Sequence, residues 1–185
     1  MIVLPTMPET SVGHLSKTQF RQFLLGCASA HVRLFAMLAV TTGGRKSAIL
    51  QAKWDQVDFD RAIFQLNADG RRQNSKYRAT VPLNEMILAP LIDAKEKATA
   101  PYIIEHRGKG LGQIKNGIDT AAKRSGIKVH PHMFRHSAAV WMAEDRVPMA
   151  EIASFLVHRN IAVTVSTYAH YSPDYLRGAA QSLTL

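Results

Sequence analysis

A segment near the C-terminal end of the chain, STYAHYSP at residues 166–173, contains two tyrosines with the potential for chemistry. Tyr168 and Tyr171 lie three residues apart, with His170 between them. A tyrosine here is either a packing residue or a nucleophile that nearby cations must activate, because its ordinary pKa is about 10. Tyr168, Tyr171 and Tyr175 also form one helical stripe, which core or interface packing would explain. The segment alone leaves both interpretations open.

A second segment, HPHMFRHSAAVWM at residues 130–142, gathers cations on one helical face. If Pro131 lies in the first turn, His132, Arg135 and His136 fall at positions i, i+3 and i+4. A bound phosphate would balance them against the apolar residues that follow. The spacing of His132 and His136 also fits helical zinc ligands, but no acidic third ligand is evident. We expect neither a metal nor a cofactor, and a plain basic helix start is the third interpretation.

Three further cations lie at chain reversals. Arg45 directly follows the Gly43-Gly44 pair that ends an apolar segment, and His158 ends a helical segment ten residues before Tyr168. Lys76 lies in NSKYRATVPL, at a turn between two presumed strands. Each has an ordinary explanation by itself, as a partner of a helix C-terminus or part of a solvated hairpin.

The elements that must position these residues are mainly helical. Ser16 and Gln19 form a capping box for a helix that begins near residue 15, and an apolar helix follows at residues 31–44. Alternating or β-branched segments then predict a small antiparallel sheet, and the chain is helical again from residue 112. Pro90 should interrupt or kink a helix at residues 84–97. The strands are expected at residues 54–60, 62–70 and 77–84, with an extended segment at 101–105.

Composition favours a polyanionic partner. The 185 residues carry 23 Lys and Arg against 14 Asp and Glu, a net charge of +9. Such a surplus is typical of nucleic-acid binding, with an anionic membrane surface second. The single cysteine excludes an intrachain disulfide and fits a reducing compartment, and no membrane span or signal peptide is evident. We therefore expect a cytoplasmic protein.

In order and spacing, these segments resemble the catalytic domain of phage-integrase-type tyrosine recombinases over about residues 15–180. TTGGRKSAILQAKWDQVDFD is similar to the family's first-arginine box, HPHMFRHSAAVWM to its His-x-x-Arg-His box, and FLVHRNIAVTVSTYAHYSP to its box with histidine and tyrosine. The resemblance implies that Tyr168 is the nucleophile and that Tyr171 and Tyr175 pack. It implies the catalytic set Arg45, Lys76, His132, Arg135, His158 and Tyr168.

This chain departs from the family pattern at three positions. Many relatives carry the hairpin lysine one or two positions before Lys76, where this chain has Asn74 and Ser75. Ala48 stands where the family usually has glutamate, and Val157 replaces the glycine before the histidine. These departures keep open the hypothesis of a DNA-binding module that has lost catalysis.

The resemblance implies an α+β, mainly α-helical domain with a three-stranded antiparallel sheet after the first helices. We expect a loose arm at residues 1–14, the catalytic domain at 15–185, and no N-terminal DNA-clamping domain. The implied activity is site-specific cleavage and rejoining of double-stranded DNA through a 3′-phosphotyrosyl bond, without metal or ATP. The resemblance also implies that the chain is a monomer alone and forms a homotetramer on DNA. A type IB topoisomerase or a telomere resolvase would use a similar set of residues, and a plain basic globular protein is a further hypothesis.

Overall fold

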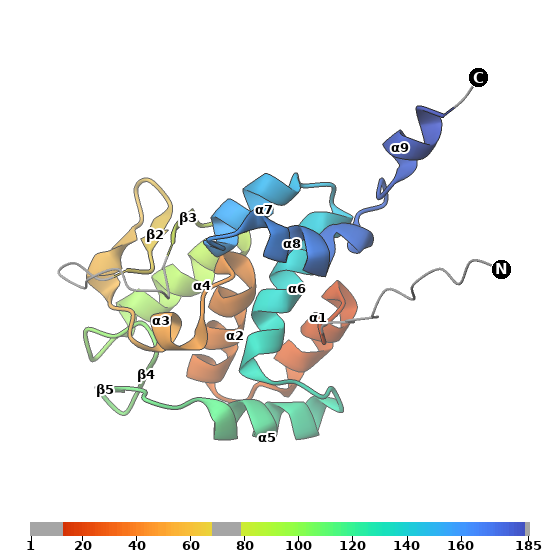
Figure 1. Cartoon of the computed structure of the whole chain (residues 1–185). Helices are drawn as coiled ribbons and strands as arrows, with labels where there is room; N and C mark the ends of the chain where they lie inside the picture. Colours follow the sequence, from red (N-terminus) through yellow and green to blue (C-terminus); the bar gives the residue numbers. More distant parts are fainter. Residues whose placement is uncertain (1–12, 68–78, 184–185) are drawn as a thin grey trace.

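A computed structural model describes residues 13–67 and 79–183 of the chain. It confirms the expected α+β, mainly α-helical class with a three-stranded antiparallel sheet after the first helices (Figure 1). The first half contains α1 (Lys17–Gly26), α2 (Ala30–Thr42), α3 (Lys46–Leu50), the 3-10 turn η1 (Trp54–Gln56), β1 (Val57–Asp58), β2 (Ile63–Gln65), β3 (Thr80–Pro82) and α4 (Glu85–Glu96). The second half contains β4 (Glu105–His106), β5 (Lys109–Gly110), α5 (Lys115–Ser125), α6 (Pro131–Glu144), α7 (Met149–Leu156), α8 (Ile161–Tyr168), the 3-10 turn η2 (Ala169–Tyr171) and α9 (Arg177–Gln181).

The centre of the molecule is formed by α2 and α6, which run side by side (Figure 1). Helix α2 is apolar nearly all round and is buried along most of its length, as its sequence predicts. Phe134 of α6 lies at the meeting point of three helices. Its ring centroid is 6.0 Å from that of Phe20, 5.4 Å from that of Phe23 and 6.4 Å from that of Phe35. These aromatic contacts fix α6 against α1 and α2.

Helix α1 begins as the sequence predicts. The Ser16 side chain accepts a hydrogen bond from the Gln19 backbone N–H, and the Gln19 side chain accepts one from the Ser16 backbone N–H. This capping box satisfies two backbone donors at a helix start that would otherwise lack partners.

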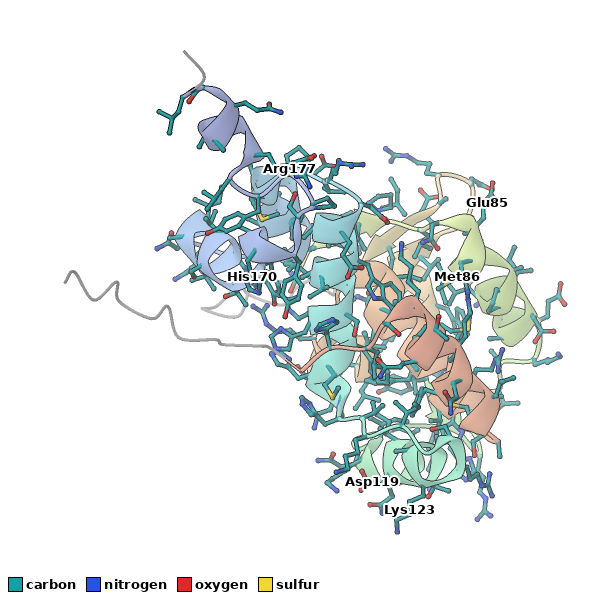
Figure 2. All side chains as sticks on the ribbon, turned by 90° about the vertical axis from the view of Figure 1, so that its right-hand side faces the viewer. Glu85, Met86, Asp119, Lys123, His170 and Arg177 are labelled. Atoms are coloured by element: carbon teal, nitrogen blue, oxygen red, sulfur yellow. The ribbon has the colours of Figure 1, made fainter. Side chains whose placement is uncertain are left out.

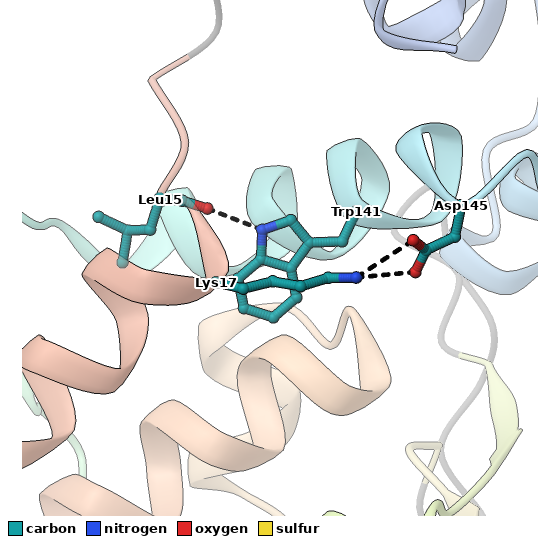
Figure 3. A network of polar contacts seen from close by, with 4 residues as sticks. All are labelled: Leu15, Lys17, Trp141 and Asp145. Carbon is teal, nitrogen blue, oxygen red and sulfur yellow. Dashed lines mark hydrogen bonds and ion pairs between the residues drawn. The ribbon is translucent and has the colours of Figure 1, made fainter. Parts of the chain in front are cut away.

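The start of α1 is also tied to the far half of α6 (Figure 3). The Trp141 indole Nε1 donates to the Leu15 carbonyl oxygen at 2.8 Å. Beside it, Lys17 Nζ forms an ion pair with Asp145 at 2.9 Å. The indole bond is partly buried and the ion pair is exposed, so the indole should contribute more to stability.

The sheet has the strand order β1-β2-β3, with both pairings antiparallel. Its register sets Val57 opposite Phe64 and Phe64 opposite Val81, and all three side chains are buried. The strands are shorter than expected, and residues 54–56 form η1 before β1 begins. The expected extended segment at 101–105 makes one bridge from Tyr102 to Lys53 and leads into the β4–β5 hairpin, which the sequence did not predict.

Helix α4 runs through Pro90 without a break, so of the two expected effects of this proline, interruption or a kink, the interruption does not occur. Ile87 and Leu91, on either side of the proline, are fully buried. Tertiary packing of this apolar face therefore outweighs the hydrogen bond that proline cannot donate.

The C-terminal part of the chain leaves the body of the fold. Helix α9 projects away from the remaining helices and has no buried residue (Figure 1). Figure 2 shows His170 and Arg177 on this side, away from Glu85 and Met86 at the start of α4. Leu176 and Leu183 are exposed. Within the ranges that the structure describes, no helix has the length and apolarity needed to cross a bilayer.

Candidate active site

Arg45 is positioned by a tight turn between α2 and α3. Gly43 takes the left-handed conformation with φ of 59°, and Arg45 is the N-cap residue of α3. A Cβ on Gly43 would lie 2.6 Å from Leu156 Cδ2, and one on Gly44 would lie 3.0 Å from Ile49 Cγ1. Both glycines are therefore required, one for its backbone conformation and both for close packing. The turn holds Arg45 where α2 meets the end of α7.

Arg135 projects from α6 into the same region and is buried. Its Nη1 donates to the Gly43 carbonyl oxygen and its Nη2 to the Leu156 carbonyl oxygen. These carbonyls lie at the C-terminal ends of α2 and α7, where the helix dipoles carry partial negative charge. Burial, and secondly the positive charge of Arg45, lowers the pKa of Arg135 to about 10, so it stays charged at neutral pH.

The two arginines line one small cavity. Ala48, Val157 and Ala79 complete its wall beside them. Among the described residues, the lining is Thr42, Gly43, Gly44, Arg45, Ala48, Leu66, Ala79, Arg135, Phe155, Leu156 and Val157. None of these described side chains is acidic. An anion is the natural complement of such a cavity.

His158 lies directly after the turn that ends α7. Its backbone N–H donates to the Ala153 carbonyl oxygen at 2.9 Å, and its Nδ1 lies 2.8 Å from the hydroxyl oxygen of Thr164, which is buried. Burial, and secondly the charges of Arg135 and Arg45, lowers the pKa of His158 to about 4. The imidazole is therefore neutral at pH 7. When Nδ1 accepts from Thr164, Nε2 carries the proton and can donate it in a hydrogen bond.

Tyr168 ends α8 and is 3% exposed. Its hydroxyl oxygen lies 2.7 Å from Nδ1 of His136 on α6. Burial raises the pKa of Tyr168, while the charge of Arg135 acts in the opposite direction. The phenol is therefore protonated at rest, and its polar end points into the cation cluster on α6.

His132 lies one helical turn before His136, as the sequence predicts. The two rings make an edge contact with centroids 4.6 Å apart, and His132 is exposed. Burial of part of the ring, and secondly the charge of Arg135, lowers the pKa of His132. Within the described ranges, no three His, Cys, Asp or Glu side chains come together as metal ligands would.

The other expectations for the site have three different outcomes. Lys76 lies outside the described residues, although Ala79 three positions later lines the arginine cavity. Tyr171 packs against the hydrophobic cluster that contains Tyr168 and against the ring of His14, as expected. Tyr175 is 40% exposed, so it does not pack in the core of this chain, and packing at an interface stays a prediction.

Two comparisons with known proteins point to the same family as the geometry of the site. The family model of the phage integrase family matches residues 14–174, which include Arg45, Lys76, His132, Arg135, His158 and Tyr168. The chain belongs to the phage integrase family. This integrase-family chain is 24% identical over 224 residues to the tyrosine recombinase XerC-like protein of Caldanaerobacter subterraneus subsp. tengcongensis, covering 98% of this chain and 57% of the relative. It is 25% identical over 191 residues to the tyrosine recombinase XerA of Thermococcus onnurineus, covering 98% of this chain and 66% of the relative.

Solved structures agree on the fold. The crystal structure of XerA recombinase matches with a TM-score of 0.74 at 20% identity, covering 99% of this chain and 68% of the other. The catalytic domain of bacteriophage HP1 integrase matches with a TM-score of 0.68 at 20% identity, covering 94% of this chain and 96% of the other. This integrase-family chain thus spans about two thirds or less of the curated relatives' length, while it matches the HP1 catalytic domain nearly end to end.

Sequence reasoning missed one site residue, His136. It places this histidine in the His-x-x-Arg-His segment but leaves it out of the catalytic set. The signal that could have found it is its position next to Arg135 and one turn after His132, on the face that carries the other cations. Its contact with Tyr168 joins residues 32 positions apart and depends on how α8 packs on α6.

Proposed function

We propose that this chain cleaves and rejoins double-stranded DNA through a 3′-phosphotyrosyl bond on Tyr168. The observation that carries this proposal is that Arg45 and Arg135, 90 residues apart, line one cavity, and none of its described lining residues is acidic. Tyr168 and His158 lie close enough to Arg135 for its charge to act on their pKa values. This arrangement offers an anion site and a nucleophile together.

The arginines stabilise the phosphate as it is attacked. Attack on a phosphodiester adds negative charge to its non-bridging oxygens, and a guanidinium binds two such oxygens in a fixed geometry. Arg135 is held by the two helix-end carbonyls, so little reorganisation is needed when the charge develops. His158 and His132 supply further hydrogen-bond donors. Loss of one such donor typically costs about 3–4 kcal/mol of transition-state stabilisation.

Tyr168 makes the exchange reversible. Its oxygen attacks phosphorus, and the bond from phosphorus to the DNA 5′-oxygen breaks. The phosphotyrosyl bond keeps the energy of the broken bond, so a second 5′-hydroxyl can reverse the reaction without ATP. Lys76 is the proposed general acid that protonates the departing 5′-oxygen.

DNA is the proposed partner for two reasons. The integrase of transposon Tn1549 and lambda integrase, both similar in fold to this chain, were solved bound to DNA. The net charge of +9 also favours a polyanion. Binding through phosphate contacts should weaken with salt, with a slope of log K against log salt of about −0.9 per phosphate contacted.

A homotetramer on DNA is the proposed assembly, with a monomer in the absence of DNA. Helix α9 supports this assembly if it docks on a neighbouring copy of the chain. It buries no residue on its own body, and Leu176 and Leu183 are exposed. Such a helix is stabilised by docking its apolar side on another copy.

The hypothesis of a module that has lost catalysis is not favoured. Its motivation was Ala48, Val157 and the position of the lysine. The structure brings Arg135, His158 and Tyr168 into one cluster, and the left-handed turn that a glycine would make is made by Val157.

The test is covalent trapping on DNA that is nicked so that the cleaved end diffuses away. Wild type should form a DNA-linked band under denaturing conditions, and Tyr168→Phe should form none. Tyr175→Phe is the matched control, because that exposed tyrosine lies seven residues further on and should leave the band unchanged. A band that survives in Tyr168→Phe and is lost in Tyr171→Phe would overturn the nucleophile assignment.

A further inference from the structure

The His136 imidazole is the direct partner of the tyrosine hydroxyl. Its Nδ1 lies 2.7 Å from Tyr168 Oη, a distance typical of a strong O–H···N hydrogen bond. The ring centroids lie 6.0 Å apart, and both side chains are at least partly buried. The contact is therefore not a surface encounter of two mobile side chains.

The environment of His136 keeps its ring neutral, so that the ring can accept this hydrogen bond. Burial, and secondly the neighbouring cations, lowers the pKa of His136 to about 4, so its ring is neutral at pH 7. Tyr168 is protonated, because burial raises the pKa of its hydroxyl. A neutral imidazole facing a phenol accepts through one nitrogen and carries its proton on the other. In the tautomer with the imidazole proton on Nε2, Tyr168 donates to Nδ1, and this is the tautomer that can take the phenol proton.

The other two histidines of the site are placed differently. His158 Nδ1 is engaged by the Thr164 hydroxyl. His132 is exposed and meets His136 by a ring edge. Of these three histidines, His136 is the one whose ring nitrogen lies within hydrogen-bond distance of the nucleophile oxygen.

We propose that His136 is the proton acceptor for Tyr168 during attack on DNA. As the Oη–H bond breaks, the proton passes to Nδ1 and Oη forms its bond to phosphorus. The bond from phosphorus to the 5′-oxygen then breaks, and the leaving oxygen takes a proton from a separate acid. When a 5′-hydroxyl later attacks the phosphotyrosyl bond, it returns its proton to the base form of that acid. Tyr168 leaves and recovers the proton from Nδ1, so His136 ends each cycle unchanged.

Burial is the main cause of the neutrality of His136, and the groups that face its ring add to that effect. Four of them are histidines or an arginine, next to which a proton on the ring is disfavoured, and the fifth is the phenol of Tyr168. They are His130 at the N-cap of α6, His132 and Arg135 within α6, His158 from the turn after α7, and Tyr168 from α8. The negative charge that DNA brings to this cluster favours protonation of the ring at the moment of transfer.

This inference rests on the proposed function, so one arm of its test does not use DNA cleavage. A hydroxyl proton held between Oη and Nδ1 exchanges slowly and should give a resolved proton resonance coupled to Nδ1 of ¹⁵N-labelled histidine. We expect it in wild type and in the control His106→Asn, which changes a histidine on the β4–β5 hairpin. It should vanish in Tyr168→Phe and His136→Ala. Its absence from wild type, or its persistence in His136→Ala, overturns the pairing.

The second arm measures the rate of covalent complex formation with saturating nicked DNA. His136→Ala and His136→Asn should cleave about 100-fold or more slowly at pH 7, a typical loss for a missing general base. Asn offers an acceptor oxygen and preserves the fold, but it cannot take the proton. Because the variants must lose the tyrosine proton to solvent, the ratio of wild-type to variant rates should shrink by about tenfold per pH unit between pH 7 and 9. Free imidazole should partly restore His136→Ala.

The outcomes separate the two proposals. A rate ratio that stays constant with pH, without rescue by imidazole, means that His136 only packs against Tyr168 and overturns the proton-acceptor role. A wild-type protein that shows the hydroxyl resonance but never forms a covalent complex overturns the proposed function and the acceptor role, while the pairing stands. A pH-dependent ratio together with imidazole rescue supports both proposals.

Discussion

The guanidinium of Arg135 donates a hydrogen bond to the carbonyl oxygen of Gly43, 92 residues earlier in the chain. This one bond joins α6 to the turn that presents Arg45. A second bond from the same guanidinium to Leu156 adds the end of α7, just before His158. The two bonds that anchor Arg135 thus also connect it to the turns that present Arg45 and His158.

Arg135→Lys should damage both stability and cleavage, because a single ammonium on a flexible stem cannot replace the two bonds of a planar guanidinium. We expect a loss of about 2 kcal/mol in the free energy of unfolding, the range for buried hydrogen bonds of a charged group. Cleavage should fall by about 100-fold or more. Urea denaturation and covalent trapping measure the two effects. Arg45→Lys, at a partly buried position, should reduce cleavage similarly with a smaller loss of stability.

Val157→Gly should stabilise the protein. Val157 has φ of 52°, a left-handed conformation that a β-branched residue adopts only with strain. Relief of that strain, less the greater freedom of glycine in the unfolded chain, should raise the free energy of unfolding by about 0.5–1 kcal/mol. Val157→Ala keeps the Cβ that causes the strain, so its stability should not rise. Equal gains from both variants would show that side-chain bulk, rather than backbone strain, limits this turn.

Stability should fall as the pH drops from 7 toward 5. The pKa values of His136 and His158 are lowered to about 4, below the ordinary value of 6.5 that they recover on unfolding. Between these values the unfolded chain binds protons that the folded chain does not, so acid favours unfolding. The urea midpoint should decline through this window. His158→Asn should flatten the decline, and an unchanged slope in His158→Asn would contradict the proposed burial of the neutral ring.

Trp141→Phe should cost more stability than Asp145→Asn, although both residues join α1 to α6. Phenylalanine cannot donate to the Leu15 carbonyl, and the loss of that partly buried bond should cost about 1 kcal/mol. The Lys17–Asp145 ion pair is exposed on both sides, so its loss should cost well under about 1 kcal/mol. Thermal or urea unfolding of the two variants gives the order directly. The reverse order would mean that the ion pair, not the indole, fastens the start of α1.

Removal of residues 177–185 should leave the fold intact and prevent assembly on DNA. Helix α9 buries no residue on its own body, so the free energy of unfolding should change little. If α9 docks on a neighbouring copy, the shortened chain should still bind a single DNA site but form no larger complex. Sedimentation with and without DNA measures this. Unfolding of the shortened chain, or full assembly without α9, would contradict the docking of α9 on a neighbouring copy.

Local patterns were sufficient for much of the fold. The capping box at Ser16 and the all-apolar helix that became α2 were predicted correctly, because capping and burial depend on neighbouring residues. The local pattern did not decide whether Pro90 interrupts or only kinks α4, since the continuation of this helix depends on the burial of Ile87 and Leu91 against other elements. The β4–β5 hairpin was missed, because its strands are two residues long and carry no alternating pattern.

The order of amino acids specifies the residue types at the site: the cations at chain reversals, the cation face of α6 and the tyrosine of α8. Which of these residues meet is set by the packing of the helices. That packing turns His136 toward Tyr168 and gives Arg135 the end carbonyls of two helices, while His132 stays exposed. The physical reason is that hydrogen bonds between residues 21 to 92 positions apart depend on how helices pack, which no local periodicity encodes.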